Sequence, residues 1–373
     1  MAIQHDTIQD LHVGLEITRR CTMRCPYCYV VPEVGRDVEF KTDWWIRLME
    51  LIKQTYAGRI YAHLAGGEIF LKEGISDLIL WLADQEIPTT VVTNGLMVPE
   101  PLLTAGRLKA GTTRFRMKVS LDGLKSEHEQ TRRHFDRVVH TVEALIENGI
   151  DLSLWTTVHS GNLQGMSDFH YYLDEFGSQL DRRIRVEIQP VLRHPRRYVP
   201  EFERMRLPLA DYLETGIEVT QQTQSMEHVE TRWRFVEDLI DPGIPPDTVP
   251  LQSALYGCST GVGLEINANG DVLLCEMDTP VFTFSEQLEG DAVAFALEET
   301  DRRAVPRRRC LVCTYKTICG MCRLTPILHG YTAGFGYQDC QDLMRDLIHF
   351  YEAYQMECVQ PTPPSSGVGP ETK

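Results

Sequence analysis

The chain has 373 residues, 43% hydrophobic and 24% charged, and these proportions exclude a largely disordered protein. Its 37 basic and 53 acidic residues give a net charge of −16, which argues against nucleic acid as the main partner because phosphate binding needs a basic surface. No apolar run of about 18 residues occurs and the N-terminus lacks a targeting signal, so we expect no membrane partner and a cytoplasmic location.

The first 190 residues alternate strand-like and helix-like segments. Helical spacing of apolar residues predicts helices at residues 43–56, 75–85, 102–110, 133–148 and 167–176. Strands are predicted at residues 13–18, 59–65, 89–93, 114–121, 150–158 and 184–190. This alternation predicts an α/β fold of parallel strands joined by right-handed crossovers, in a barrel or an open sheet, and we assign residues 1–192 to it.

The pattern changes after that domain. Residues 193–250 hold several prolines and arginines and are predicted to form a linker and bridging helices, one of them at 209–223. Residues 251–350 have little hydrophobic periodicity but contain seven cysteines, so a small loop-rich domain stabilised by its cysteines is predicted. Residues 351–373 are predicted to be a helix end and a disordered tail.

Three cysteines, Cys21, Cys25 and Cys28, directly follow the first predicted strand. Barrels and open α/β sheets place their chemistry at the carboxyl ends of the strands. Three thiolates can hold a small inorganic centre, and a four-iron cluster held by three ligands keeps one iron open for a substrate or cofactor. A zinc site completed by a distant histidine is the alternative, and so is chance.

The CxxxCxxC spacing resembles the signature of the radical S-adenosylmethionine (SAM) enzymes. Segments similar to the family's follow in chain order at successive strand ends: Gly66-Gly67-Glu68, Thr93-Asn94, Ser120 to Gly123, Arg132 with His128, and Ile188 to Pro190. Each segment alone also fits an ordinary turn or core position. The resemblance implies a partial (β/α)6 barrel and SAM contacts from Gly66, Gly67, Glu68, Thr93, Asn94, Ser120, Asp122, Arg132 and Gln189.

The resemblance also implies roles for these residues. Glycines 66 and 67 allow the backbone to approach a ligand closely, and Glu68 can pair with the SAM ammonium. Arg132 is expected at the SAM carboxylate and Gln189 near the adenine. A reduced [4Fe–4S] cluster would bind SAM and generate a 5′-deoxyadenosyl radical, which abstracts a hydrogen atom from an unactivated C–H. A reductant protein such as flavodoxin or ferredoxin is then an implied partner.

The later cysteines resemble the SPASM extension, which adds auxiliary iron–sulfur clusters to radical SAM enzymes. The resemblance implies one complete [4Fe–4S] cluster on Cys310, Cys313, Cys319 and Cys340, and a second on Cys258, Cys275 and Cys322 that leaves one iron without a cysteine. Two residues separate Cys319 from Cys322, where the family usually has three. Zinc is the alternative, although five residues between the two CxxC pairs are few beside the roughly 15–20 of zinc ribbons.

Two carboxylates, Glu276 and Asp278, follow Cys275. In sulfatase-maturing relatives an acidic residue directly after the corresponding cysteine acts as a base. The resemblance therefore implies that Glu276, with Asp278 as the neighbouring candidate, takes the proton released after hydrogen abstraction. A solvated carboxylate in a turn is the alternative.

Auxiliary clusters favour a reaction in which the substrate radical loses an electron. We therefore expect oxidation of a peptide or protein residue, by dehydrogenation or cross-linking, as in peptide and sulfatase maturases. Epimerisation would need a thiol donor, and only Cys358 is left unassigned. The alternatives are tailoring of a small molecule (sugar, nucleoside or antibiotic intermediate) and a non-enzymatic iron–sulfur or zinc protein. The first strand is expected to begin by residue 13, so no leader-binding module is expected before it. We therefore expect either a separate leader-binding protein or a small substrate.

Overall fold

The computed structural model describes residues 10–28, 30, 39–109, 111, 114–191, 204–233, 263–273 and 282–304. Among these residues, no helix is long and apolar enough to cross a membrane. All cysteines after Cys28 lie outside the described residues, as do Glu276 and Asp278 and the segment 351–373.

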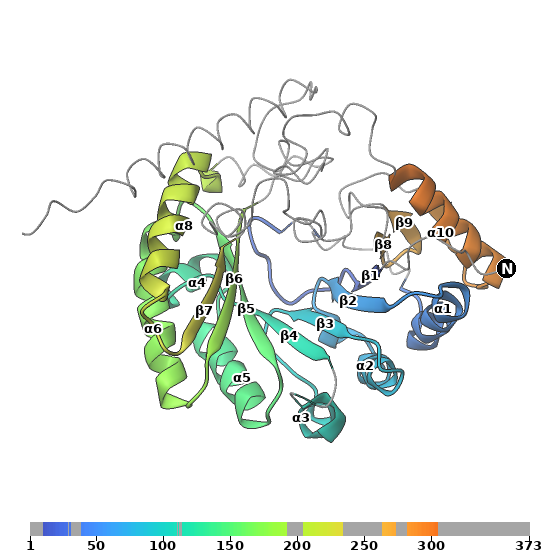
Figure 1. Ribbon diagram of the computed structural model, residues 1–373, viewed down its shortest axis with the longest axis horizontal. Coiled ribbons are helices and arrows are strands. Elements are labelled where there is room, and N and C mark those ends of the chain that lie inside the picture. The colour runs from blue at the N-terminus through green and yellow to red at the C-terminus, as the bar shows by residue number, and fades with distance from the viewer. Residues whose placement is uncertain are drawn as a thin grey trace, which may run out of the picture.

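A parallel sheet organises the described chain (Figure 1). Its first six strands follow in sequence order: β1 (Leu11–Thr18), β2 (Ile60–Gly66), β3 (Thr89–Thr93), β4 (Phe115–Ser120), β5 (Leu152–Val158) and β6 (Ile184–Pro190). Each of them pairs in parallel with the next. All six predicted strands are therefore confirmed.

The sheet extends beyond these six strands on both sides. β7 (Val229–Trp233) pairs in parallel with β6, and β8 (Gly263–Ile266) pairs in parallel with β1. The short strands β9 (Asp271–Leu273) and β10 (Phe282–Thr283) add antiparallel pairs beside β8. In the described residues the order runs from β10 to β7 without closing, so the sheet is an open, partial barrel.

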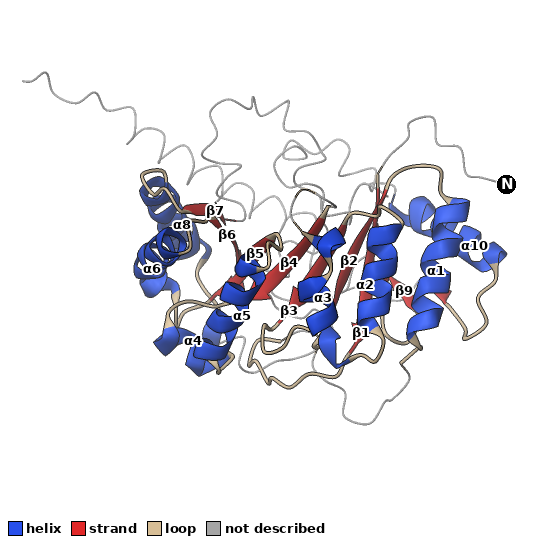
Figure 2. Ribbon diagram, turned by 90° about the horizontal axis from the view of Figure 1, so that it is seen from below, coloured by secondary structure: helices blue, strands red, loops and turns tan. Residues whose placement is uncertain are grey.

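Helices cover the outer face of this sheet (Figure 2). They are α1 (Thr42–Thr55), α2 (Ile75–Asp84), α3 (Glu100–Thr104), α4 (Lys125–Thr131), α5 (Phe135–Glu147), α6 (Met166–Gln179), α8 (Leu209–Thr223) and α10 (Gly290–Ala304), with single 3₁₀ turns η1 (Ile69–Leu71), η2 (Gly106–Leu108) and η3 (Leu163–Gly165). The helix predicted at residues 209–223 is confirmed. The helix predicted at 102–110 is wrong, because the chain forms only α3 and η2, with Ala105 between them, and Gly106 at the start of η2 disfavours a continuous helix.

The apolar core lies between the sheet and these helices. Alternate residues of β1 (Val13, Leu15 and Ile17) are at most 1% exposed, and they belong to the same cluster as Trp45 and Ile52 of α1. A strand places successive side chains on opposite faces, so this alternation explains why one face of the sheet is apolar.

The opposite face of the sheet is polar. Lys118 of β4 forms a close ion pair with Glu187 of β6. The Asp151 carboxylate forms two ion pairs, with Arg116 Nε at 2.9 Å and with Arg185 Nη1 at 3.0 Å. Parallel sheets usually carry apolar side chains on both faces, and (β/α) barrels fill their interior with them. This inner face is therefore suited to a polar ligand rather than to a closed apolar core.

Candidate functional site

The carboxyl ends of the strands gather most of the residues predicted to be functional. Cys21, Cys25 and Cys28 follow β1, Glu68 follows β2, and Asn94 follows β3. Ser120 ends β4, Asp122 comes two residues later, and Gln189 lies near the end of β6. Because the carboxyl ends of parallel strands meet at one edge of a sheet, these segments share that edge.

The three cysteines are half-buried, and hydrogen-bond donors are directed at two of their sulfurs. Met23 donates its backbone N–H to Cys21 Sγ at 3.4 Å, and Asn94 Nδ2 lies 3.9 Å from the same sulfur. Arg132 Nη1 lies 3.9 Å from Cys25 Sγ. Burial raises the pKa of the Cys25 thiol to about 11, while the Arg132 guanidinium lowers it. These donors suit sulfurs that carry negative charge, as thiolate ligands do.

The spacing of the thiols bears on the kind of metal centre. Among the described residues, no three His, Cys, Asp or Glu side chains are placed to hold one metal ion. A zinc ion needs all its sulfur ligands within about 2.3 Å of a single point, whereas each thiolate of a four-iron cluster binds its own iron. The two kinds of centre therefore differ in how their sulfur ligands must be arranged.

Gly66 and Gly67 let the end of β2 lie against the segment that leads into the cysteines. A Cβ on Gly66, whose φ is +136°, would lie 2.3 Å from the Thr18 carbonyl oxygen, and one on Gly67 would lie 2.2 Å from that of Arg20. The backbone N–H groups of Gly67 and Glu68 donate to the same two carbonyls, each at 2.7 Å. The close approach that these glycines allow is thus to the chain's own backbone.

Glu68 is 2% exposed and joins the ends of β2 and β3. Its carboxylate accepts hydrogen bonds from the Asn94 N–H at 2.7 Å, the Thr93 hydroxyl at 2.8 Å and the Phe70 N–H at 3.2 Å. Burial raises the pKa of Glu68, although these hydrogen bonds lower it. Glu68 therefore fixes Asn94, whose side chain lies beside Cys21.

Asp122 and Arg132 form a buried ion pair behind Cys25. Arg132 Nε donates to Asp122 Oδ2 at 2.8 Å, and the side chains are 11% and 0% exposed respectively. Burial lowers the pKa of Arg132, but the carboxylate of Asp122 and the thiol of Cys25 raise it above its ordinary value. The guanidinium is therefore held positive next to the cysteine segment. The side chain of Tyr27, between Cys25 and Cys28, also donates to Asp122 Oδ2.

His159 also lies at this edge, and it was not predicted from the sequence. It follows β5 directly, is 3% exposed, and its ring lies 5.9 Å from that of Tyr27. Its Nδ1 accepts from the Gly161 N–H, and among the described residues no group pairs with its buried Nε2. Its place at a strand end is the signal that could have found it.

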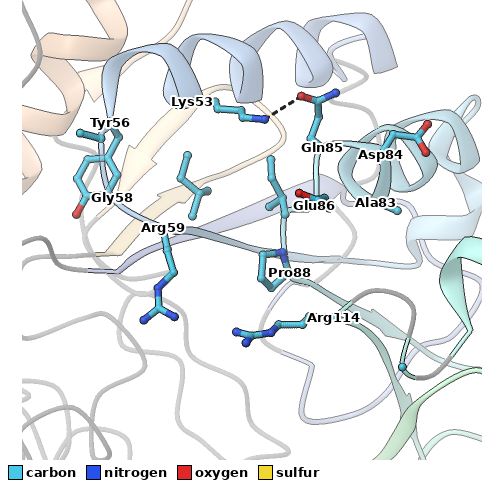
Figure 3. Close-up of a pocket in the computed structure, with 14 residues that line it drawn as sticks. Lys53, Tyr56, Gly58, Arg59, Ala83, Asp84, Gln85, Glu86, Pro88 and Arg114 are labelled. Atoms are coloured by element: carbon cyan, nitrogen blue, oxygen red, sulfur yellow. Dashed lines mark hydrogen bonds between the residues drawn. The ribbon is translucent and has the colours of Figure 1, made fainter.

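A cavity of about 980 Å³ lies elsewhere, at the amino ends of the strands (Figure 3). Arg59 and Ile60, at the start of β2, and Pro88, just before β3, line it, together with Lys53, which donates to Gln85 at 2.9 Å. None of the residues predicted to be functional lines this cavity, so it is not the candidate active site.

Comparison with known families supports the assignment made from the strand ends. Residues 15–176 match the profile of the radical SAM superfamily. The chain contains a radical SAM domain. The matched residues run from β1 into α6 and include the three cysteines, Glu68, Asp122 and Arg132.

Two curated relatives match parts of the chain. A PqqA peptide cyclase of Granulibacter bethesdensis is 24% identical over 156 residues, which are 40% of this chain and 40% of that protein. A GTP 3′,8-cyclase of Petrotoga mobilis is 32% identical over 152 residues, 38% of this chain and 44% of that protein. The match thus spans less than half the length of these relatives.

The radical SAM domain also has similar solved structures. A structure of native anSMEcpe with bound AdoMet and the Cp18Cys peptide superposes with a TM-score of 0.67 and 15% identity, and the match covers 94% of this chain and 99% of that one. This likeness confirms the predicted α/β radical SAM fold with an open parallel sheet.

The predicted auxiliary cluster ligands lie outside the described residues, as do Glu276 and Asp278. Of the chain's predicted loop-rich domain, residues 263–273 and 282–304 are described, and they contain β8, β9, β10 and the 15-residue α10. This part has more regular structure than its weak periodicity predicted.

Proposed function

We propose that this chain is a radical SAM enzyme that oxidises a residue of a peptide or protein, by dehydrogenation or by forming a cross-link. The observation that carries the proposal is the cysteine segment at the end of β1, with Asn94 and Arg132 directed at its sulfurs. The similarity to a PqqA peptide cyclase favours a peptide substrate. The polar inner face of the sheet suits a substrate with many hydrogen-bonding groups, such as a peptide.

In this proposal Cys21, Cys25 and Cys28 hold a [4Fe–4S] cluster that leaves one iron open to SAM. When bound, the cluster and SAM together supply a 5′-deoxyadenosyl radical that abstracts a hydrogen atom from the substrate. Arg132, already charged and fixed by Asp122, offers its remaining N–H groups to the SAM carboxylate.

The remaining predicted SAM contacts lie at the same edge, but we propose a role for Glu68 other than pairing with the SAM ammonium. Glu68 acts mainly through Asn94, because its own oxygens already accept three hydrogen bonds. Ser120 is 4% exposed at the end of β4, and Gln189 lies near the end of β6, where it is proposed to meet the adenine.

The oxidative reaction depends on the C-terminal cysteines. We propose a complete auxiliary cluster on Cys310, Cys313, Cys319 and Cys340, and an incomplete one on Cys258, Cys275 and Cys322. Glu276, beside Cys275, is the proposed base for the proton that leaves the substrate, with Asp278 as the neighbouring candidate. A flavodoxin or ferredoxin is the proposed reductant.

A small-molecule substrate is the second candidate function. The 32% identity to a GTP 3′,8-cyclase favours it, since that relative is named for a reaction on a nucleotide. Mass spectrometry of products separates the reaction types: oxidation removes two hydrogens from a peptide or small molecule, whereas epimerisation leaves the mass unchanged in water.

The reconstituted chain is expected to bind about three four-iron clusters, or roughly twelve irons. With dithionite it should cleave SAM to methionine and 5′-deoxyadenosine, because the domain holds both cofactors without a substrate. Iron and sulfide analysis of the anaerobic protein and chromatography of the nucleoside products check this. A chain that binds zinc in place of iron, or iron without SAM cleavage, contradicts the proposed function.

A further inference from the structure

Asp122 is the most completely enclosed carboxylate of the candidate site. Its side chain is 0% exposed, and both oxygens accept hydrogen bonds from the protein. Oδ2 accepts from Tyr27 Oη, from Thr131 Oγ1 at 3.3 Å and from Arg132 Nε at 2.8 Å. Oδ1 accepts from the Thr157 N–H at 3.1 Å. A carboxylate with this set of donors has no exposed oxygen to offer to a ligand.

We propose that Asp122 is a positioning residue, which prepares the SAM site through Arg132 and Tyr27 without touching SAM. The inference rests on the proposed function and replaces the direct SAM contact that the sequence predicted for Asp122. Arg132 and Tyr27 come from segments 105 residues apart, since Tyr27 lies in the cysteine segment and Arg132 follows α4. One carboxylate oxygen anchors both.

Arg132 needs such an anchor for two physical reasons. An arginine side chain is long and flexible, and the bond from Nε to Asp122 leaves the terminal nitrogens directed elsewhere; Nη1 lies 3.9 Å from Cys25 Sγ. A buried guanidinium is also costly without a counter-charge, and Asp122 supplies it. The anchor therefore sets both the direction and the charge of the group proposed to bind the SAM carboxylate.

The cysteine segment is tied to the same point. The Tyr27 hydroxyl donates to Asp122, and the ring of Tyr27 lies 5.5 Å from the guanidinium carbon of Arg132. Asp122 itself is held by its backbone, because its N–H donates to His128 Nδ1 at 3.2 Å and its carbonyl accepts from Asn162 Nδ2 at 2.6 Å. A rigid Asp122 thus holds the cluster segment and Arg132 in one arrangement.

The test is a double-mutant cycle in the reconstituted full chain. SAM affinity is measured by equilibrium dialysis for the wild type, Asp122→Asn, Arg132→Gln and the double variant. Iron content is measured for each protein. The electron paramagnetic resonance spectrum of each reduced protein is recorded with and without SAM. Asp122→Asn is expected to weaken SAM binding by about tenfold, the effect of losing a hydrogen bond to a charged group. The double variant should bind SAM no more weakly than Arg132→Gln, because Asp122 and its bond to Tyr27 affect SAM affinity by fixing Arg132.

Asp136→Asn is the matched control, since it removes the same charge from a side chain that is 74% exposed and pairs with Lys125. It should leave SAM affinity unchanged. If Asp122→Asn binds SAM as wild type does, or if the two effects add in the double variant, the inference is overturned. A wild-type chain that binds iron but not SAM overturns the proposed function instead.

A second variant covers the case in which Asp122→Asn fails to fold or to bind iron. Tyr27→Phe keeps the ring and removes one hydroxyl, so it should fold, bind iron as wild type does and bind SAM a few times more weakly. That loss should disappear in the Arg132→Gln background. A Tyr27→Phe effect of equal size in both backgrounds contradicts the shared anchor.

Discussion

Replacing Cys21, Cys25 and Cys28 together by alanine is expected to abolish SAM cleavage completely while leaving iron bound to the C-terminal cysteines. The three thiols lie at one strand end and are the only cysteines among the described residues. Without them none of the described residues at that edge offers a thiolate to hold the cluster that SAM needs. Iron should fall by about a third, from three clusters to two. Iron analysis and a SAM-cleavage assay with dithionite check both outcomes.

Cys358→Ala is the matched control for that variant, because Cys358 is the one cysteine without a proposed cluster. It should keep the wild-type iron content and cleave SAM at the wild-type rate. If the triple alanine variant loses all of its iron, the division of the cysteines into an N-terminal and a C-terminal group is wrong. A triple variant that still cleaves SAM would remove the basis of the proposed function.

The six strands could be predicted because each has a strong local signal. The strands predicted at residues 89–93 and 184–190 agree with β3 and β6 at both ends. β8 gave no such signal. It has only four residues, too few to show a period, and its partner β1 lies about 250 residues earlier in the chain. A pairing over that separation depends on tertiary structure, which local sequence patterns do not contain.

Helix boundaries were harder to predict where the backbone takes an unusual conformation. The predicted helix at 133–148 begins two residues later, at Phe135, because Arg133 and His134 have φ angles of +67° and +60°. Arginine and histidine rarely adopt this left-handed conformation, and the residue types alone gave no reason to expect it. α4, just before this turn, has seven residues and was not predicted.

The site residues could be placed from the sequence, but their partners could not. The order of motifs along the chain predicted that Glu68, Asp122 and Arg132 lie at one edge of the sheet, and the structure places them there. That Asp122 faces only protein donors depends on contacts with Tyr27 and Thr157, which lie 95 and 35 residues away. Such contacts follow from packing, so a motif indicates a residue's location better than its role.

Glu68→Ala is expected to destabilise the fold strongly, independently of any cofactor. It leaves three donors buried without an acceptor, from Phe70, Thr93 and Asn94, and each lost partner costs about 1–3 kcal/mol. The free energy of unfolding should fall by roughly 3–9 kcal/mol, a large share of the 5–15 kcal/mol typical of a domain. Denaturant unfolding followed by circular dichroism measures this loss.

Two further variants separate this effect from a simple change of charge. Glu73→Ala removes the same charge from an exposed position five residues later and should change stability by less than about 0.5 kcal/mol. Glu68→Gln keeps one acceptor oxygen but places an NH₂ group among donors, so its loss should be intermediate. If Glu68→Ala is as stable as Glu73→Ala, the hydrogen bonds between the ends of β2 and β3 do not hold the site together. SAM binding by a stable Glu68→Gln variant then reports how far Asn94 depends on that carboxylate, because Glu68 accepts the Asn94 N–H and so holds the Asn94 side chain beside Cys21.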